Sequence, residues 1–331
     1  MHYHRPMLIE PQALLGALSA DRAVSGAELA RGLGVTRAAV WKQIEHLREL
    51  GAPVEAAPGS GYRLAWPLEP LDADRIRGEL DAATRKRLAA LAVHWRIDST
   101  STELQRRAAA AHGTEACLAE TQTAGRGRRG REWQSPLGGN LYFSLLHRFD
   151  AGMAALSGLS LVAGIAVVDA LADCGVGGIG LKWPNDVLAR GKKLAGILVE
   201  LGGEFLGPCH AVIGIGVNLR LPPATLARID QPAIDVASLG NGEVPSRNRL
   251  AARLIARLVE ALDRFEPQGF AAFADAYARH DVLRGHDVRV FAAGAAHEGV
   301  AAGIDGRGAL IVRHGKTTTH YDSAEVSVRA A

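Results

Sequence analysis

The residue pattern of this chain changes twice along its length, and that constrains the possible fold more than any other feature. Residues 1–66 carry short helical patterns, and residues 67–281 alternate apolar strand-like runs with longer helical runs. Residues 282–331 hold only short alternating runs separated by Gly and Asp. With 331 residues in all, we predict an α+β multidomain protein whose three domains are these three ranges.

The first range predicts a helix-turn-helix. Ser25 and Glu28 have the spacing of a capping box at a helix start. A tight Gly turn follows, and then a second helix that Thr36 can cap and that Gly51 can end. An ordinary helical hairpin is the alternative interpretation.

Two short candidate strands at residues 54–56 and 62–64 follow these helices and predict a wing. The module carries almost equal numbers of basic and acidic residues, so its charge does not decide whether it binds DNA. DNA binding would require Arg37, Lys42 and Arg63 to share one face.

The middle range predicts a mixed α/β domain, and the last range a small β-barrel. Strands of the middle range are expected at residues 93–97, 116–120, 140–147, 180–183, 194–201 and 211–217. Helices are expected at residues 72–91, 102–111, 153–174, 248–265 and 269–279. Strands of the last range are expected at residues 286–291, 298–303, 309–313, 318–321 and 325–328.

Composition excludes several protein classes. The longest apolar stretch, residues 161–168, is too short to span a membrane, and residues 1–6 lack an apolar signal segment. Cys117, Cys174 and Cys209 are odd in number and widely spaced, which excludes a disulfide scaffold or a zinc ribbon. No His pairing typical of a metal site occurs. We expect a cytoplasmic protein without a membrane partner or a metal site of its own.

The most informative segment is residues 125–131, Gly-Arg-Gly-Arg-Arg-Gly-Arg. It fits the spacing of a dinucleotide-binding fingerprint, but that motif requires a helix to start at its third Gly. Pro136 and two following glycines leave no room for this helix before residue 140. A flexible loop that binds an anion is favoured instead, with Trp133 as an aromatic face for a base. A solvated basic loop is the alternative.

Three further segments carry polar groups at the ends of strands. Lys182 ends a short apolar run and precedes Trp-Pro, which predicts an amine held rigidly enough to stabilise charge on a phosphate. Asn218 ends a strand with two glycines, and residues 98–101 place hydroxyls where a strand meets a helix. Each also has a plain structural explanation: a strand-end lysine reaching solvent, close packing, and a helix cap. Residues 185–186 can simply close a turn.

In this order, and behind a predicted winged helix, the segments resemble the bifunctional biotin protein ligases that also act as biotin operon repressors. The resemblance covers nearly the whole chain, and the combination of motifs is more specific than any one of them. Its strongest carriers are residues 125–130 with Trp133, 182–186, 193–197 and 214–218. Residues 36–42 and 59–62 look like the recognition helix and wing of that family.

The resemblance implies a two-step reaction and a set of site residues. Biotin and ATP, with Mg²⁺, would give biotinyl-5′-AMP and pyrophosphate, and a lysine of a biotin carboxyl carrier protein would then take the biotinyl group. Biotin would be bound by Ser99, Thr100, Ser101, Gln122, Arg126, Gly127, Arg128 and Lys182, with Ser101 where family members often have Asn. The nucleotide would be bound by Arg128, Trp133, Lys182 and Asn218, of which Lys182 and Arg128 would be catalytic.

The resemblance also implies partners and an architecture. The adenylate-bound protein would form a homodimer that binds operator DNA through Arg37, Trp41, Lys42 and Arg63. The C-terminal domain would be a small SH3-like β-barrel. Two other functions stay open: a transcription regulator that senses a small molecule without catalysis, and a lipoate ligase.

Overall fold

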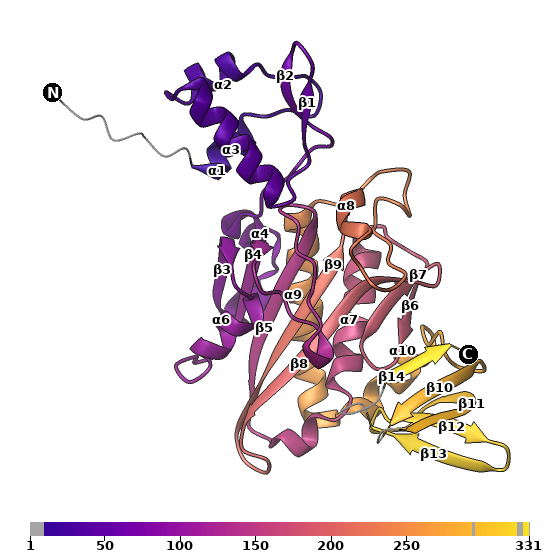
Figure 1. Cartoon of the computed structure of the whole chain (residues 1–331). Helices are drawn as coiled ribbons and strands as arrows, with labels where there is room; N and C mark the ends of the chain where they lie inside the picture. Colours follow the sequence, from indigo (N-terminus) through magenta and orange to yellow (C-terminus); the bar gives the residue numbers. More distant parts are fainter. Residues whose placement is uncertain (1–9, 293–294, 323–326, 331) are drawn as a thin grey trace.

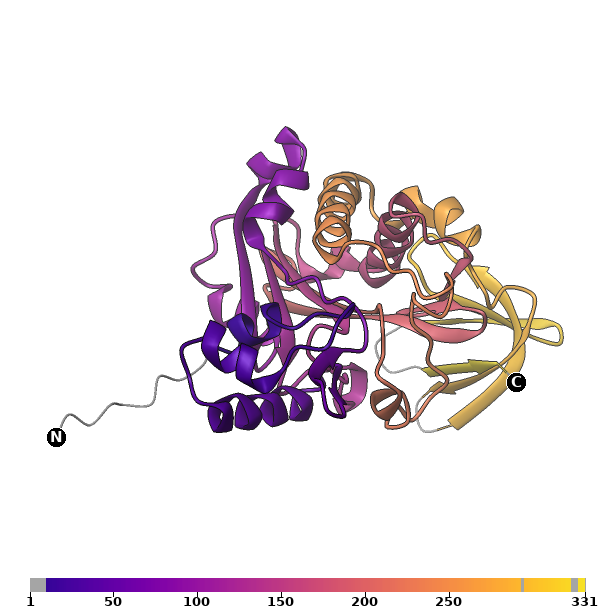
Figure 2. The ribbon, with the colours of Figure 1, turned by 90° about the horizontal axis from the view of Figure 1, so that it is seen from above.

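The computed structural model describes residues 10–292, 295–322 and 327–330, so the predicted N-terminal segment 1–6 lies outside the described residues. Three parts follow one another in space as they do in sequence: a small helical module, a large sheet with helices, and a second sheet (Figure 1 and Figure 2). Within the described residues, no helix combines the length and the apolar character that a membrane crossing requires.

The N-terminal module is a helix-turn-helix followed by a two-stranded antiparallel hairpin, as predicted. Its elements are α1 (Pro11–Gly16), α2 (Gly26–Gly32), α3 (Arg37–Glu49), β1 (Val54–Ala57) and β2 (Gly61–Leu64). Ser25 Oγ accepts a hydrogen bond from the Glu28 amide (3.1 Å), and Thr36 Oγ1 accepts one from the Ala39 amide (3.1 Å). The Glu28 carboxylate does not complete the capping box, because it binds Arg22 instead (3.0 Å). We refer to this module as the winged helix.

The central part is a mixed seven-stranded sheet in the order β3-β4-β5-β9-β8-β7-β6. Only β3 and β4 run parallel, and every other neighbouring pair is antiparallel. The strands are β3 (Leu88–Ile97), β4 (Thr114–Gln122), β5 (Asn140–Phe149), β6 (Ile179–Lys182), β7 (Asp186–Ala189), β8 (Lys192–Gly203) and β9 (Cys209–Asn218). The helices are α4 (Ala73–Glu79), α5 (Ala82–Arg87), α6 (Thr100–Arg107), α7 (Leu159–Asp173), α8 (Pro223–Leu226), α9 (Arg247–Gln268) and α10 (Ala274–Ala278).

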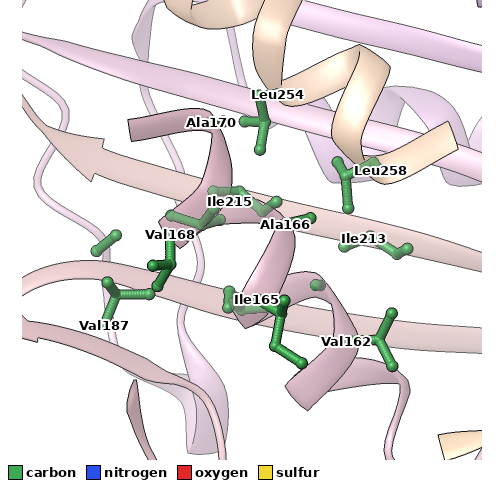
Figure 3. Close-up of a cluster of buried hydrophobic side chains, with 14 of the residues drawn as sticks. Val162, Ile165, Ala166, Val168, Ala170, Val187, Ile213, Ile215, Leu254 and Leu258 are labelled. Carbon is green, nitrogen blue, oxygen red and sulfur yellow. The ribbon is translucent and has the colours of Figure 1, made fainter. Parts of the chain in front are cut away.

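Side chains alternate along each strand, so the two faces of this sheet carry different residues and pack against different helices. Helices α7 and α9 cover one face, and the main core lies between them and strands such as β7 and β9 (Figure 3). Helix α6 packs on the other face, where Leu104 meets Leu146 and Val212. Next to α6 this second face carries Ser144, Gly214 and Gly216 instead of large apolar side chains, so a hollow remains there.

The structure corrects three predictions for the central part. The expected helix 72–91 consists of α4 and α5 and ends at residue 87, because Leu88 already pairs with Thr114 at the start of β3. The expected helix 153–174 is broken at Gly158, whose φ of 81° is left-handed, into a 3₁₀ turn (Met153–Leu156) and α7. Residues 185–186 do more than close a turn, since Asp186 opens strand β7, which was not predicted.

The C-terminal part is a five-stranded antiparallel sheet in the order β13-β12-β11-β10-β14. Its strands are β10 (Asp287–Ala292), β11 (Ala295–Ile304), β12 (Leu310–His314), β13 (Thr317–Tyr321) and β14 (Ser327–Ala330). The expected strand 325–328 falls partly outside the described residues. A turn of this sheet contacts the central part, where the buried Trp183 donates through Nε1 to the Gly308 carbonyl (3.0 Å).

Candidate active site

A small hollow lies where the start of α6 meets strands β4, β5 and β9. Seven of the residues predicted for biotin line it: Ser99, Thr100, Ser101, Gln122, Arg126, Gly127 and Arg128. Its volume of about 50 Å³ holds only a few waters. A bound ring would therefore require the loop 125–133 to move.

The polar wall of this hollow has a fixed hydrogen-bonding pattern. The Thr100 amide, which can only donate, lies 2.9 Å from Oε1 of Gln122 and so fixes the orientation of that side-chain amide. The Gln122 Nε2 group then faces Ser135 Oγ (3.3 Å). This wall can exchange hydrogen bonds with a polar, uncharged ring.

Ser144 adds a hydroxyl that the sequence analysis missed. It is fully buried on β5, and its Oγ lies 2.7 Å from Thr100 Oγ1 and 2.9 Å from Ser101 Oγ. Gly214 allows this, because a Cβ at that position would come 2.5 Å from Ser101 Oγ. The three hydroxyls therefore form one connected chain under the hollow.

Glycines on β8 and β9 make room for the indole of Trp133. A Cβ at Gly216 would come within 2.3 Å of the Trp133 ring, and one at Gly196 within 2.9 Å. The indole Nε1 is buried and has no hydrogen-bond partner among the described residues. The ring therefore lies directly against the sheet.

The loop from residue 125 to residue 133 folds back on itself. The Trp133 amide donates to the Gly125 carbonyl (2.9 Å), and the Gly127 amide donates to the Arg131 carbonyl (2.7 Å). A 3₁₀ turn, Arg128–Gly130, stands where the dinucleotide motif would need an α-helix. Arg126 attaches the loop to the sheet through Glu200 (2.9 Å). The loop thus forms a flap over the small hollow.

Arg128 points into the interior of the site. Its Nη1 donates to Asn185 Oδ1 (3.2 Å). Burial, and then the neighbouring Arg129 charge, lower its pKa from the ordinary value. An anionic ligand stabilises a partly buried cation of this kind more strongly than it stabilises a cation exposed to solvent.

A larger hollow of about 860 Å³ continues from the small one under the same loop. Among the described residues that line it are six cationic and three acidic side chains. The cations are Arg128, Arg129, Arg131, Lys182, Lys193 and Arg228, and the acids are Glu132, Asp186 and Asp230. This excess of positive charge suits a polyanion such as a nucleoside triphosphate.

Lys193 borders both hollows, and the sequence analysis gave it no role. Its Nζ lies 2.7 Å from Asp186 Oδ1 and 5.6 Å from the centre of the Trp133 ring. Arg128, Trp133 and Asn185 also border both hollows. The sequence did contain a signal for a role of this lysine: it begins the glycine-containing segment 193–197, which was already part of the family resemblance.

The structure places two residues predicted for the nucleotide, Lys182 and Asn218, at the same larger hollow. Lys182 ends β6 and lines the larger hollow, together with residues of the flap. Asn218 also lines the larger hollow, but its side chain is engaged within the protein. Its Nδ2 donates to the Ile234 carbonyl (3.2 Å), and its Oδ1 accepts from Asn140 (3.5 Å).

The larger hollow offers a carboxylate that could hold Mg²⁺ together with the phosphates of a ligand. The described residues contain no cluster of three or more His, Cys, Asp or Glu that could hold a metal ion. Mg²⁺ is usually held by one or two carboxylates and substrate phosphates. Asp186, on the wall of the larger hollow, fits that role.

The residues predicted for DNA lie on the surface of the winged helix. Arg37 begins α3, and Trp41 and Lys42 follow one turn later; the Trp41 side chain is 59% exposed. Arg63 is exposed on β2, where it pairs with Glu55 (2.9 Å). A DNA phosphate would have to compete with Glu55 for Arg63.

Two regions of the chain match known protein families. Residues 93–218 match the Biotin/lipoate A/B protein ligase family, and residues 12–63 match an HTH domain. The chain is 39% identical to the bifunctional ligase/repressor BirA of Salmonella typhimurium over 321 residues, which cover 97% of this chain and 98% of that protein. The chain belongs to the biotin protein ligase family.

Other members of the biotin protein ligase family are also similar to this chain. The biotin--[acetyl-CoA-carboxylase] ligase of Mycobacterium tuberculosis is 36% identical over 77% of this chain and 98% of its own length. A solved biotin protein ligase from Aquifex aeolicus, in complex with biotin and ATP, aligns with a TM-score of 0.63 at 27% identity. That alignment covers 73% of this chain and 100% of the Aquifex chain. The matched regions lie inside the predicted first and second domains.

Proposed function

We propose that this ligase makes biotinyl-5′-AMP from biotin and ATP and then transfers biotin to a lysine of a biotin carboxyl carrier protein. The observation that carries the proposal is the junction of a small polar hollow with a large cationic one at Lys193, Arg128 and Trp133. An acyl-adenylate has the same two parts, a small ring and a nucleotide, joined at one phosphate.

The small hollow is assigned to the ureido ring of biotin. Its wall offers the Gln122 amide and the hydroxyls of Ser99 and Thr100, which match a ring that both donates and accepts hydrogen bonds. The dithiolane ring of lipoate has no such groups and would leave this wall unpaired. The wall therefore favours biotin over lipoate.

The first step forms a bond between a biotin carboxylate oxygen and the α-phosphorus of ATP, while the bond from that phosphorus to the bridging oxygen breaks and pyrophosphate leaves. Lys182 and Lys193 line the larger hollow and would stabilise charge on the phosphate. Mg²⁺ bound together with ATP would neutralise phosphate charge, and Asp186 would help to hold it. Trp133 would cover the adenine.

The flap protects the product of this step. A mixed anhydride hydrolyses in water, so its lifetime depends on keeping the site closed. Arg128 would order the loop around the adenylate through Asn185. In the second step the carrier lysine attacks the acyl carbon, and AMP leaves.

The direct test uses the purified full chain with biotin, ATP and Mg²⁺. We expect biotinyl-5′-AMP by mass spectrometry, and a carrier domain one biotinyl group heavier when it is added. A carrier lysine→Arg variant is the control. Failure to form either product would contradict the proposal.

We propose further that the winged helix binds operator DNA as a repressor, and that the adenylate-bound protein does so as a homodimer. The exposure of Arg37, Trp41 and Lys42 on α3 supports this. Arg37→Ala and Lys42→Ala should weaken binding to a duplex from the biotin operon promoter without changing ligation. DNA affinity that does not fall with salt would contradict phosphate contacts.

The C-terminal sheet is proposed to be the SH3-like β-barrel of the family, assisting ATP and carrier binding. The five antiparallel strands support the barrel assignment. The Trp183 to Gly308 hydrogen bond supports a role in ATP binding, because Trp183 directly follows Lys182. We also propose a cytoplasmic location, where the carrier protein and ATP are found.

A further inference from the structure

Leu137 belongs by sequence to the segment between the flap and β5, but it packs inside the winged helix. Its side chain is fully buried in the hydrophobic cluster of that module, which includes Val40, Ile44 and Leu47 of α3. The core of the winged helix is therefore completed by a residue from the neighbouring domain.

The backbone on either side of Leu137 is fitted to the end of α3. The Leu137 amide donates to the carbonyl of Leu50, the residue that caps α3 (2.8 Å). Gly51 follows with a left-handed φ of 84°, and a Cβ there would come 2.8 Å from Pro136 Cβ. Residues 136–137 thus contact the end of the recognition helix by both hydrogen bonding and close packing.

The same segment lies behind the wall of the small hollow, where it contacts the lining residue Gln122. The Ser135 carbonyl accepts from Thr121 Oγ1 (2.7 Å), and Ser135 Oγ accepts from Gln122 Nε2 (3.3 Å). The Pro136 carbonyl accepts from the buried hydroxyl of Tyr142 (2.7 Å). Gln122, at the hollow, and Leu50, at the end of α3, are therefore joined through only three consecutive residues, 135–137.

We propose that Leu137 is a positioning residue that supports the small hollow from within the winged helix, so that ligand binding and the end of α3 are linked within a single chain. Three residues span at most about 10 Å, so the segment has little slack to absorb a displacement. Packed contacts move together rather than deform separately. The link rests on the proposed function only in taking biotin as the ligand.

The test compares the full-length wild type with Leu137→Ala. Titration calorimetry gives the biotin affinity, and hydrogen exchange gives the protection of the Gly51 and Ala52 amides, with and without biotin and ATP. Both amides are bonded to carbonyls of α3, so changes at its end are measurable. In the wild type, ligand should slow their exchange. In Leu137→Ala, biotin affinity should fall by about fivefold or more, and the response at Gly51 and Ala52 should be lost.

Leu15→Ala is the matched control, because Leu15 is buried in the same cluster but lies on α1. It should destabilise the winged helix while leaving biotin affinity and the ligand response unchanged. Leu137→Met should restore both readouts. Equal effects of the two Ala variants, or an unchanged ligand response in Leu137→Ala, would overturn the link. Absence of biotin binding by the wild type would instead contradict the proposed function.

Discussion

The Nζ atom of Lys193 lies 2.7 Å from Oδ1 of Asp186, at the boundary between the small and the large hollow. Both side chains are mostly buried, with 15% and 21% of their surface exposed. This contact holds the amine beside the place where an acyl group would meet a phosphate. Lys182 reaches the large hollow from the neighbouring strand β6.

Lys182→Ala and Lys193→Ala should each slow adenylate formation by roughly 10²- to 10³-fold, because each removes a fixed charge near the reacting phosphate. The measurement is single-turnover formation of biotinyl-5′-AMP, with circular dichroism to check the fold. Lys192→Ala, at an exposed neighbouring position, is the control and should be neutral. A wild-type rate in either test variant would exclude that amine from the reaction.

Arg128→Gly should release the activated intermediate. The change removes the contact with Asn185 that attaches the flap to the turn before β7. We expect biotin to appear on lysines of an unrelated protein such as serum albumin, detected by avidin blotting. Arg190→Gly is the control, because Arg190 lines neither hollow and has a left-handed φ of 49° that glycine adopts without strain. If albumin stays unlabelled with Arg128→Gly, the flap does not retain the adenylate.

Gly216→Ala should displace the Trp133 indole, since the new Cβ would come 2.3 Å from the ring. We expect a higher KM for ATP, and a free energy of unfolding lower by about 1 to 3 kcal/mol from overpacking. Steady-state kinetics and urea unfolding measure the two effects. Gly177→Ala, which has no heavy atom within 4 Å of its Cβ position, is the control. An unchanged KM for ATP would show that Trp133 does not cover the nucleotide.

Burial of His147 should make the protein less stable in mild acid. Desolvation, and to a smaller extent the Arg87 charge, lower the pKa of His147 to about 4, whereas an unfolded histidine titrates near 6.5. The folded state therefore binds fewer protons, and the stabilisation is complete above pH 6.5 and is lost as the pH falls towards 4. Its full size is roughly 3 kcal/mol.

Urea unfolding at pH 7.5, 6.0 and 5.0 tests this expectation. The wild type should lose more of its free energy of unfolding between pH 7.5 and 5.0 than His147→Gln, which lacks the titrating group. Thr114→Val is a second control, because it removes the hydroxyl that lies 2.8 Å from His147 Nδ1 but keeps the imidazole. Parallel pH profiles for wild type and His147→Gln would refute the assignment.

Local signals in the sequence were enough to predict the winged helix. The caps at Ser25 and Thr36 and the stop at Gly51 act within a few residues of each other, so they can be predicted without tertiary contacts. Strand β7 has only four residues, and its position depends on pairing with β6 and β8. Pairing between strands leaves little signal in the local sequence of a short strand.

Parts of the candidate site could be predicted where a short sequence motif by itself indicates the chemistry of its residues. The flap and the hydroxyls of residues 99–101 are of that kind, and both lie at the small hollow. Lys193 and Ser144 gain their roles only when the sheet brings β5, β8 and the flap together. Leu137 follows a proline and precedes two glycines, so no periodicity indicates that it completes the core of another domain.

The assignment of the two hollows is tested most directly by the exchange of labelled pyrophosphate into ATP by the pure protein with Mg²⁺. We expect exchange that requires biotin, is not supported by lipoate, and is lost in Lys182→Ala and Lys193→Ala. Exchange that is absent with biotin, or equally fast with lipoate, would contradict the assignment of the two hollows to biotin and the nucleotide.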